Sequence, residues 1–253
     1  MTDWWTALYN EHLADVLLEP ASPAEVDATM SFLVKHLALN PGDRVFDQCC
    51  GIGRLSLPLA RWGAEVVGVE QAAGYVDRAR AQAGELRASF HVGDAFAFVP
   101  DRPSAAALNW WTSFGYLPDD DANARMLARA FESLVPGGRF AIDTPNVPGL
   151  YASFRPSEIT RRTTPIGEVV MLRESWFELA RGLLHKRWTF VLPDGQRIEQ
   201  PSTLKLYSPD RMVALLAQVG FVDLQVYGGL DSRPIALDSP RCIVVGRKPA
   251  EVA

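Results

Sequence analysis

The spacing of apolar residues along this chain predicts a doubly wound α/β fold. Five short apolar runs, each bounded by turn residues, are predicted strands; they lie at 44–47, 65–69, 89–92, 104–109 and 139–143. Apolar residues recur at helical spacing between most of these runs; the predicted helices are 55–62, 74–88 and 120–134. Strands that alternate with helices pair in parallel, with helices on both faces of the sheet. A helix over 208–219 and strands at 221–227 and 242–247 complete the pattern.

The two segments outside this pattern have different periodicities. Residues 4–18 carry aromatic and aliphatic side chains at helical spacing, and Ser22-Pro23 followed by Glu25 predicts a capping box that starts a helix ending near Leu39. Beyond residue 145 the chain reads as four strands joined by turns; they are 168–174, 176–180, 184–192 and 197–206. Pro193-Asp194-Gly195 is typical of a tight turn, so these strands are predicted to be antiparallel.

These patterns divide the chain into a main domain and an insertion. Residues 1–145 and 207–253 are expected to form the α/β domain, with a helical lid over about 1–39, and residues 146–206 an antiparallel β cap. The chain has 253 residues, 48% of them hydrophobic and 22% charged, which suits one large globular domain with an insertion.

Composition excludes several kinds of site and partner. The formal net charge of −5 disfavours nucleic acid as a partner, because negative charge repels phosphate backbones. The three cysteines form no Cys-x-x-Cys pair, so neither a disulfide framework nor a metal site is expected. No basic leader and no apolar run of membrane-spanning length is present, so we expect a cytoplasmic chain with no membrane contact.

The chemistry is concentrated where the predicted strands end. The first strand runs into a tight turn that contains Gly51 and Gly53, whose missing Cβ atoms let a ligand approach the backbone. Glu70 ends the second strand, and an acid at that position can accept hydrogen bonds from both hydroxyls of a ribose. Asp94 follows the third strand, where it can accept from an adenine amino group, and Asn109-Trp110 ends the fourth. Together these residues predict an adenosine-containing cofactor.

The turn favours one class of adenosine cofactor. A dinucleotide needs Gly-x-Gly-x-x-Gly at its pyrophosphate, but Ser56 occupies the third glycine position. Asp47 precedes the turn and would repel a pyrophosphate, whereas it suits the sulfonium and ammonium groups of S-adenosylmethionine. An NAD-dependent oxidoreductase stays open as an alternative, and so does a module that binds S-adenosylmethionine without catalysis.

In these motifs the chain resembles the class I S-adenosylmethionine-dependent methyltransferases. Phe46-Asp47-Gln48-Cys49-Cys50-Gly51-Ile52-Gly53 resembles the glycine-rich first motif of that family, with Cys49 in place of its first glycine. Three later segments resemble further family motifs; they are Val67-Gly68-Val69-Glu70, Gly93-Asp94-Ala95 and Leu134-Val135-Pro136-Gly137-Gly138. The resemblance covers about 40–145 and 207–247 and implies a seven-stranded Rossmann-like sheet in the order 3-2-1-4-5-7-6, with strand 7 antiparallel.

The resemblance also implies roles for individual residues. Glu70 would hold the ribose and Asp94 the adenine amino group, with Gln71 and Ala95 flanking the adenine. The residues expected near the methionine moiety or in the turn are Asp47, Gly51, Gly53, Asn109 and Trp110. The aromatic N-terminal segment would fold over the cofactor, with Tyr9 in contact with it. A hydroxyl acceptor would need a general base, for which the candidates are Tyr9, His12, Tyr116 and His185.

The predicted insertion indicates the class of molecule that accepts the methyl group. It resembles the small cap of methyltransferases that act on amino sugars, on other antibiotic intermediates and on glycine. A cap of this kind encloses a small molecule, and its aromatic residues Trp176, Phe177, Trp188 and Phe190 would line the acceptor pocket. We therefore expect methyl transfer to an amine or hydroxyl of a natural-product intermediate, with N-methylation favoured and S-adenosylhomocysteine as product. In some relatives the cap makes subunit contacts, so a homo-oligomer formed through it is a further expectation.

Overall fold

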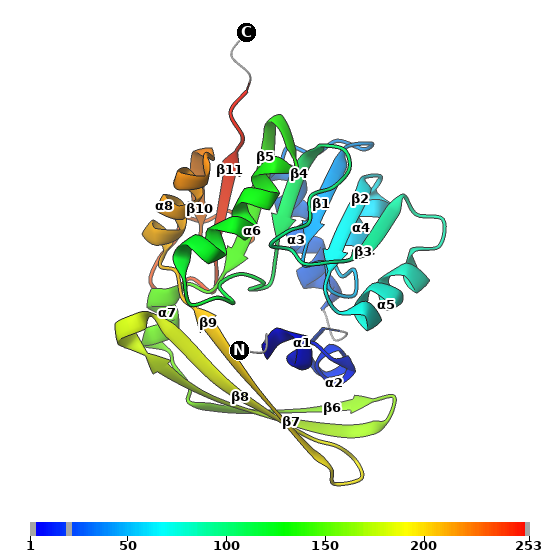
Figure 1. Ribbon diagram of the computed structural model, residues 1–253, viewed down its shortest axis with the longest axis vertical. Helices are drawn as coiled ribbons and strands as arrows, with labels where there is room; N and C mark the ends of the chain where they lie inside the picture. The colour runs from blue at the N-terminus through cyan, green and yellow to red at the C-terminus, as the bar shows by residue number, and fades with distance from the viewer. Residues whose placement is uncertain (1–3, 19–21, 251–253) are drawn as a thin grey trace.

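The computed structural model describes residues 4–18 and 22–250, and its centre is a seven-stranded sheet (Figure 1). Strand order is β10-β11-β5-β4-β1-β2-β3. The strands are β1 (Arg44–Gln48), β2 (Glu65–Glu70), β3 (Ala88–Val92), β4 (Ser104–Asn109), β5 (Leu134–Thr144), β10 (Val222–Tyr227) and β11 (Cys242–Arg247). β11 runs antiparallel to both of its neighbours, and the other pairings are parallel. The predicted fold class and strand order are therefore confirmed.

Helices cover both faces of this sheet and bury two apolar layers. The helices are α3 (Pro23–His36), α4 (Ser56–Trp62), α5 (Ala73–Ala83), α6 (Asp120–Glu132) and α8 (Pro209–Val219). Leu127 of α6 and Met212 of α8 pack on Phe46 and Phe140 from one face. Phe32 of α3 and the helix α4 pack on the opposite face, and α5 packs beside α4. Strands buried on both faces explain the continuous apolar runs in the sequence.

Several predicted boundaries are wrong by a few residues. The helix predicted to reach Ala88 ends at Ala83, because Gly84 follows with a φ of 52° and breaks the helix. The helix predicted to reach Leu134 ends at Glu132, and Pro136-Gly137-Gly138 lies inside β5 instead of preceding it. Residues 134–144 pair first with Ser104 and then, after a register shift, with the rest of β4. A local turn motif thus forms an irregular start of a strand.

Residues 157–205 form a second, separate sheet of four antiparallel strands in the order β6-β7-β8-β9. Its strands are β6 (Ser157–Thr164), β7 (Gly167–Glu178), β8 (Leu183–Val191) and β9 (Arg197–Lys205). The sequence prediction missed β6, whose residues are polar and mostly exposed, and it divided β7 into two strands. Nothing between Glu174 and Trp176 breaks the chain, so β7 continues through that point. Short α7 (Val147–Ala152) and η2 (Leu179–Arg181) complete the segment.

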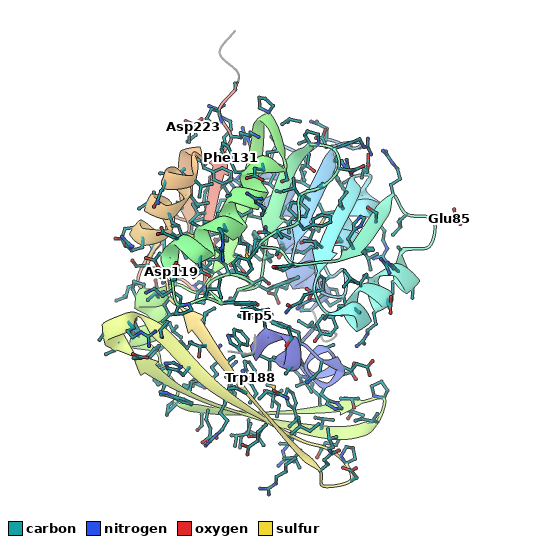
Figure 2. All side chains as sticks on the ribbon, viewed as in Figure 1. Trp5, Glu85, Asp119, Phe131, Trp188 and Asp223 are labelled. Carbon is teal, nitrogen blue, oxygen red and sulfur yellow. The ribbon has the colours of Figure 1, made fainter. Side chains whose placement is uncertain are left out.

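The N-terminal helices lie between the two sheets (Figure 1). They are α1 (Trp4–Leu8), α2 (Glu11–Leu13) and the π-helical turn η1 (Ala14–Leu18). Leu8, Leu13 and Val16 pack on Trp188 and Phe190 of the second sheet. Figure 2 shows Trp188 on the side of that sheet that faces these helices. Residues 1–3 and 19–21 of the predicted lid lie outside the described residues.

The capping box predicted at the start of α3 is not formed. Ser22 is the N-cap residue and its carbonyl accepts from Glu25 and Val26, but its side chain makes no cap hydrogen bond. Glu25 does not return to the cap either; its carboxylate pairs with Arg241 on β11's side of the molecule. The helix ends at His36, before the predicted Leu39. A tertiary ion pair has replaced the local capping box.

Candidate functional site

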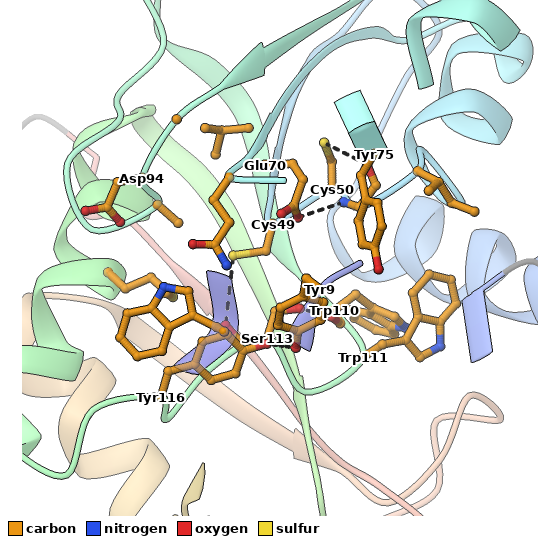
Figure 3. Close-up of a pocket in the computed structure, with 18 of the residues that line it drawn as sticks. Tyr9, Cys49, Cys50, Glu70, Tyr75, Asp94, Trp110, Trp111, Ser113 and Tyr116 are labelled. Carbon is orange, nitrogen blue, oxygen red and sulfur yellow. Dashed lines mark hydrogen bonds between the residues drawn. The ribbon is translucent and has the colours of Figure 1, made fainter. Parts of the chain in front are cut away.

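A cavity opens where β1, β2, β3 and β4 end, next to the N-terminal helices (Figure 3). Open α/β sheets bind ligands at this edge. Its walls come from the turn after β1, the ends of β2 and β3, the segment after β4, and α1. The lining residues are Trp5, Tyr9, Leu18, Cys49, Cys50, Gly51, Ile52, Arg54, Val69, Glu70, Gln71, Tyr75, Gly93, Asp94, Ala95, Phe96, Trp110, Trp111, Ser113, Tyr116 and Met126.

The turn after β1 brings its backbone to the cavity wall. Gly51 has a φ of 54°, and a Cβ built there would meet no atom within 4 Å. Cys49 takes the same left-handed region, with a φ of 62°, although it has a side chain. That conformation costs a non-glycine residue about 1–2 kcal/mol. The turn therefore keeps the shape of a glycine-rich loop at the position where cysteine replaces glycine.

Glu70 ties the turn to the end of β2. Its Oε2 accepts from the Gly51 amide at 3.2 Å and its Oε1 accepts from the Ala72 amide at 2.9 Å. Burial raises the pKa of Glu70, while these two amide hydrogen bonds lower it. A carboxylate has about four acceptor positions, so Glu70 can still accept from two further hydroxyl groups.

Asp94 lies at the opposite side of the cavity from Trp111 (Figure 3). Its Oδ1 accepts from the Phe96 amide at 2.9 Å, which holds the carboxylate in place after β3. Gln71 and Ala95 also line the cavity, one beside Glu70 and the other beside Asp94. The structure thus brings together the residues that the sequence assigned to ribose and adenine.

Three predicted cofactor-binding residues do not line the cavity. Asp47 is buried behind the turn and accepts from the Ser56 hydroxyl at 2.5 Å. Burial raises its pKa to about 7. Asn109 is also buried and donates to Gln48 at 3.2 Å. Gly53 faces α4, where a Cβ would meet Leu57 at 3.1 Å. These residues shape the turn from behind, so direct contact with a ligand is not supported for them.

Aromatic side chains close the cavity on the side of the N-terminal helices. The Tyr9 and Tyr116 rings stack with centroids 6.0 Å apart, and their hydroxyl groups are in hydrogen-bond contact. The Trp4 and Trp5 rings both approach Tyr116, at 4.9 and 5.8 Å. Burial raises the pKa of Tyr9 and of Tyr116, so both phenols are protonated at neutral pH.

His185 lies outside the cavity. Its Nδ1 contacts the Thr203 hydroxyl at 3.0 Å, and its Nε2 contacts Glu178 at 3.2 Å. The ring stacks on Trp176, which is half exposed. Neighbouring residues alternate between the two faces of β8, and this register places His185 opposite the face that carries Leu184 and Trp188. The position therefore does not support a catalytic role. His12, which approaches Phe190, does not line the cavity either.

Several lining residues were not among those predicted from the sequence. Tyr75 donates from its hydroxyl to the Asn10 carbonyl at 2.6 Å, linking α5 to the N-terminal helices. Arg54 follows the glycine turn and places its guanidinium 3.8 Å from the centroid of Trp111. A basic residue just after the glycine pair was visible in the sequence, but its partner could be known only from the fold.

The described residues contain neither a candidate metal site nor a candidate membrane-spanning helix. Over 4–18 and 22–250, no group of three or more His, Cys, Asp or Glu side chains is arranged to hold a metal ion. Within the same ranges, no helix has the length and hydropathy needed to cross a membrane.

Residues 45–138 match the model of a family described as a methyltransferase domain. The curated relatives include the 23S rRNA (uracil(1939)-C(5))-methyltransferase RlmD of Shewanella sp. (strain ANA-3), which is 38% identical over 115 residues. That match covers 44% of this chain and 23% of the relative. RlmD of Bordetella pertussis is 33% identical over 117 residues, or 24% of its length. The chain thus spans about a quarter of the length of these relatives.

Solved structures match over nearly the whole chain. The CcbJ methyltransferase from Streptomyces caelestis has a TM-score of 0.77 at 21% identity and covers 96% of this chain and 98% of its own. An S-adenosylmethionine-dependent methyltransferase from Clostridium acetobutylicum ATCC 824 has a TM-score of 0.76 at 16% identity, covering 94% and 97%. The sugar N-methyltransferase KedS8 from Streptoalloteichus sp ATCC 53650 has a TM-score of 0.73 at 20% identity, covering 91% and 89%. The fold, including the second sheet, is shared with these proteins.

Proposed function

We propose that this chain, which has the methyltransferase domain and the fold of the class I S-adenosylmethionine-dependent methyltransferases, methylates an amine of a small molecule. The observation that carries the proposal is the joining of Gly51, Glu70 and Asp94 at one cavity. S-adenosylmethionine supplies an activated methyl group, and S-adenosylhomocysteine is left after transfer. Glu70 would hold the ribose, Asp94 the adenine amino group, and Gln71 and Ala95 the adenine ring.

The cavity favours an amine over a hydroxyl as acceptor. The described residues that line it include no histidine. Tyr9 and Tyr116 are protonated at neutral pH, so neither is ready to take a proton from a hydroxyl group. A neutral amine can attack first and lose its proton to solvent afterwards. In this proposal the protein's contribution is to position the reactants and to exclude water.

The second sheet supports a small acceptor. Tyr116, Trp5 and Leu184 of β8 pack in one cluster, so this sheet packs against the aromatic side of the cavity. We take residues 146–206 as the cap that encloses the acceptor and 1–39 as the lid, as the sequence predicted. KedS8, which shares the fold, is a sugar N-methyltransferase, and this supports the choice of acceptor. The rRNA enzymes match this chain only over a partial segment, so they give no support to an RNA substrate.

Ligand-induced stabilisation tests the cofactor. Thermal unfolding would be followed with S-adenosylmethionine, S-adenosylhomocysteine and NADH in parallel. A ligand at about 100 times its dissociation constant stabilises the folded state by roughly 2.7 kcal/mol, or roughly 5–10 °C for a chain of this size. The two sulfur ligands should give this shift in the wild type and in the control Asp238→Asn, which changes an exposed acid. A shift with NADH alone would overturn the proposal.

Methyl transfer tests the acceptor. Transfer of labelled methyl from S-adenosylmethionine would be measured to a panel of amino sugars and other small amines, to matched alcohols, and to rRNA. Label on the amines and not on the alcohols supports the proposal. Label on alcohols or RNA alone would show that the acceptor is wrong although the cofactor is right.

A further inference from the structure

We propose that Asp143 is a positioning residue that holds residues 110–116 in the shape in which they face the methyl acceptor, and this inference rests on the proposed function. Asp143 lies near the carboxyl end of β5 and does not itself line the cavity. Residues 110–116 follow β4, and the four of them that line the cavity, here called the β4 wall, are Trp110, Trp111, Ser113 and Tyr116 (Figure 3). If Glu70 and Asp94 hold the adenosine, the β4 wall is left for the acceptor.

The β4 wall begins with two residues in a costly backbone conformation. Trp111 has a φ of 54° and Thr112 a φ of 63°, so both adopt the left-handed region although both have side chains. That region brings Cβ close to the following carbonyl oxygen, and only glycine adopts it without this cost. Regular pairing between β4 and β5 stops just before this point, at Asn109 and Ile142. Contacts outside the sheet ladder therefore hold Trp111 and Thr112 in place.

Asp143 makes these contacts with both its side chain and its backbone. Its Oδ2 accepts from the Trp111 amide at 3.2 Å, and its carbonyl accepts from the Thr112 amide at 3.2 Å. Asp143 is buried, so an amide that turned away from it would leave a hydrogen-bonding group without a partner in the interior. The two hydrogen bonds thus offset the cost of the left-handed conformation, and the first of them depends on the Asp143 side chain.

The carboxylate of Asp143 is itself held by an ion-pair network. Its Oδ2 accepts from Arg241 Nη1 at 2.7 Å, and Arg241 also pairs with Glu25 of α3. Glu25 Oε1 lies 3.5 Å from Trp111 Nε1. Burial raises the pKa of Asp143 to about 6, so the carboxylate is ionised at pH 8 and its hydrogen bond with Arg241 is charge-assisted. The amide and the ring of Trp111 are therefore tied to the same network.

The far end of residues 110–116 is tied to the second sheet. The Gly115 carbonyl accepts from the Lys205 amide at 2.6 Å, and a Cβ on Gly115 would lie 2.4 Å from the Lys205 carbonyl oxygen. Tyr116 packs in one cluster with Leu204 of β9. Loss of the Asp143 side chain should therefore displace the β4 wall at its Trp111 end. A displacement of about 1 Å can cost about 100-fold in rate when catalysis depends on positioning.

Hydrogen exchange tests whether Asp143 holds residues 110–116, and it needs no acceptor. Exchange would be followed by mass spectrometry at pH 8 in the wild type, in Asp143→Ala and in the exposed-acid control Asp238→Asn. We expect Asp143→Ala to exchange about tenfold faster or more in the peptide containing 110–116, with peptides of β6 to β9 unchanged. Unchanged exchange of that peptide would overturn the proposal. If Asp143→Ala does not fold, Asp143→Asn, which loses the charge and keeps an acceptor oxygen, should show the same local increase.

Kinetics test whether this contact matters for methyl transfer. The acceptor would be the amino sugar that takes up label fastest in the panel described above. We expect Asp143→Ala to lower kcat by about 10- to 100-fold. The dissociation constant of S-adenosylhomocysteine, measured by calorimetry, should change by no more than about threefold, because Glu70 and Asp94 follow other strands. Asp238→Asn should match the wild type in both measurements. An unchanged kcat, or an equal loss of S-adenosylhomocysteine affinity, would overturn the proposal.

A second substitution separates positioning of the backbone from other roles of Asp143. Thr112 does not line the cavity, and glycine adopts its φ of 63° without steric cost. Adding Thr112→Gly to Asp143→Ala should therefore raise kcat by about threefold or more over Asp143→Ala alone. A double variant with no gain would show that Asp143 acts elsewhere. If the wild type methylates no amine, the proposed function fails, whereas the hydrogen-exchange result still decides whether Asp143 holds the segment.

Discussion

Asp47 is predicted to lower the stability of the unliganded fold at neutral pH. Its side chain is 3% exposed, it has Ser56 as hydrogen-bond partner, and burial raises its pKa from an ordinary 3.8 to about 7. A carboxyl with a higher pKa in the folded chain binds its proton more tightly when folded. Stability from this group is therefore present below about pH 4 and is lost as pH rises to about 7.

The size of this loss of stability follows from the shift in the pKa of Asp47. About three pKa units at 1.36 kcal/mol each correspond to ~4 kcal/mol above pH 7. Asp47→Asn keeps the shape and an acceptor for Ser56 but carries no charge. We expect this variant to gain up to ~4 kcal/mol in free energy of unfolding at pH 8, and to lose the fall of about 1.4 kcal/mol per pH unit between pH 4 and 7.

Urea denaturation at pH 5, 6, 7 and 8 measures both the free energy of unfolding at pH 8 and its slope with pH. Asp238→Asn, which changes an exposed acid, serves as control and should follow the wild type. The charge of Asp47 also favours a cationic ligand, so Asp47→Asn should weaken S-adenosylmethionine more than the uncharged thioether of S-adenosylhomocysteine. An asparagine variant that is less stable than the wild type at pH 8, with the same pH slope, would refute the reasoning.

Three further predictions follow from contacts at the site. Glu70→Ala and Asp94→Ala should each weaken S-adenosylhomocysteine by about tenfold or more in calorimetry, and unchanged affinity in both would remove their assigned roles. Tyr116→Phe, which loses the hydroxyl contact with Tyr9, should lower turnover while leaving cofactor affinity unchanged; unaltered turnover would exclude that hydroxyl from the mechanism. Gly68→Ala should cost about 1–3 kcal/mol in urea denaturation, because its Cβ would lie 2.7 Å from Cys50 Sγ, whereas Gly74→Ala meets no atom within 4 Å and should stabilise α5 by up to about 1 kcal/mol.

The strands β1, β2, β4 and β5 were predictable because they are largely buried and therefore appear as apolar runs. Their order in the sheet was predicted from the resemblance to the class I methyltransferases. The second sheet was harder to predict. β6 is an edge strand whose residues are mostly exposed, so burial leaves no period-two pattern in its sequence. The single strand β7 was divided because polar residues interrupt its apolar ones, although the backbone pairs continuously with β8 from Val170 to Glu178.

In the candidate site too, the place of a residue in the chain was predictable, whereas the surroundings of its side chain were not. Gly51, Glu70 and Asp94 could be chosen because each ends a strand or lies within three residues of a strand's end, and parallel strands bring such positions to one edge. Asp47 and Asn109 satisfy the same rule but point behind the turn, where Ser56 and Gln48 take their polar atoms. The sequence places a residue at a strand end, but packing decides on which side of the turn its side chain lies.

By itself the sequence determined the α/β fold, the edge of the sheet that carries the site, and the acids at three strand ends. Those features depend on local periodicity and on residues adjacent in the chain. Only the tertiary structure decided that Glu25 and Asp143 pair with Arg241, and that the Arg54 guanidinium lies over the Trp111 ring. These groups come from five distant segments, and an ion pair forms between whichever charges the fold brings within reach. The charge of each residue was visible in the sequence, whereas its partner was set by packing.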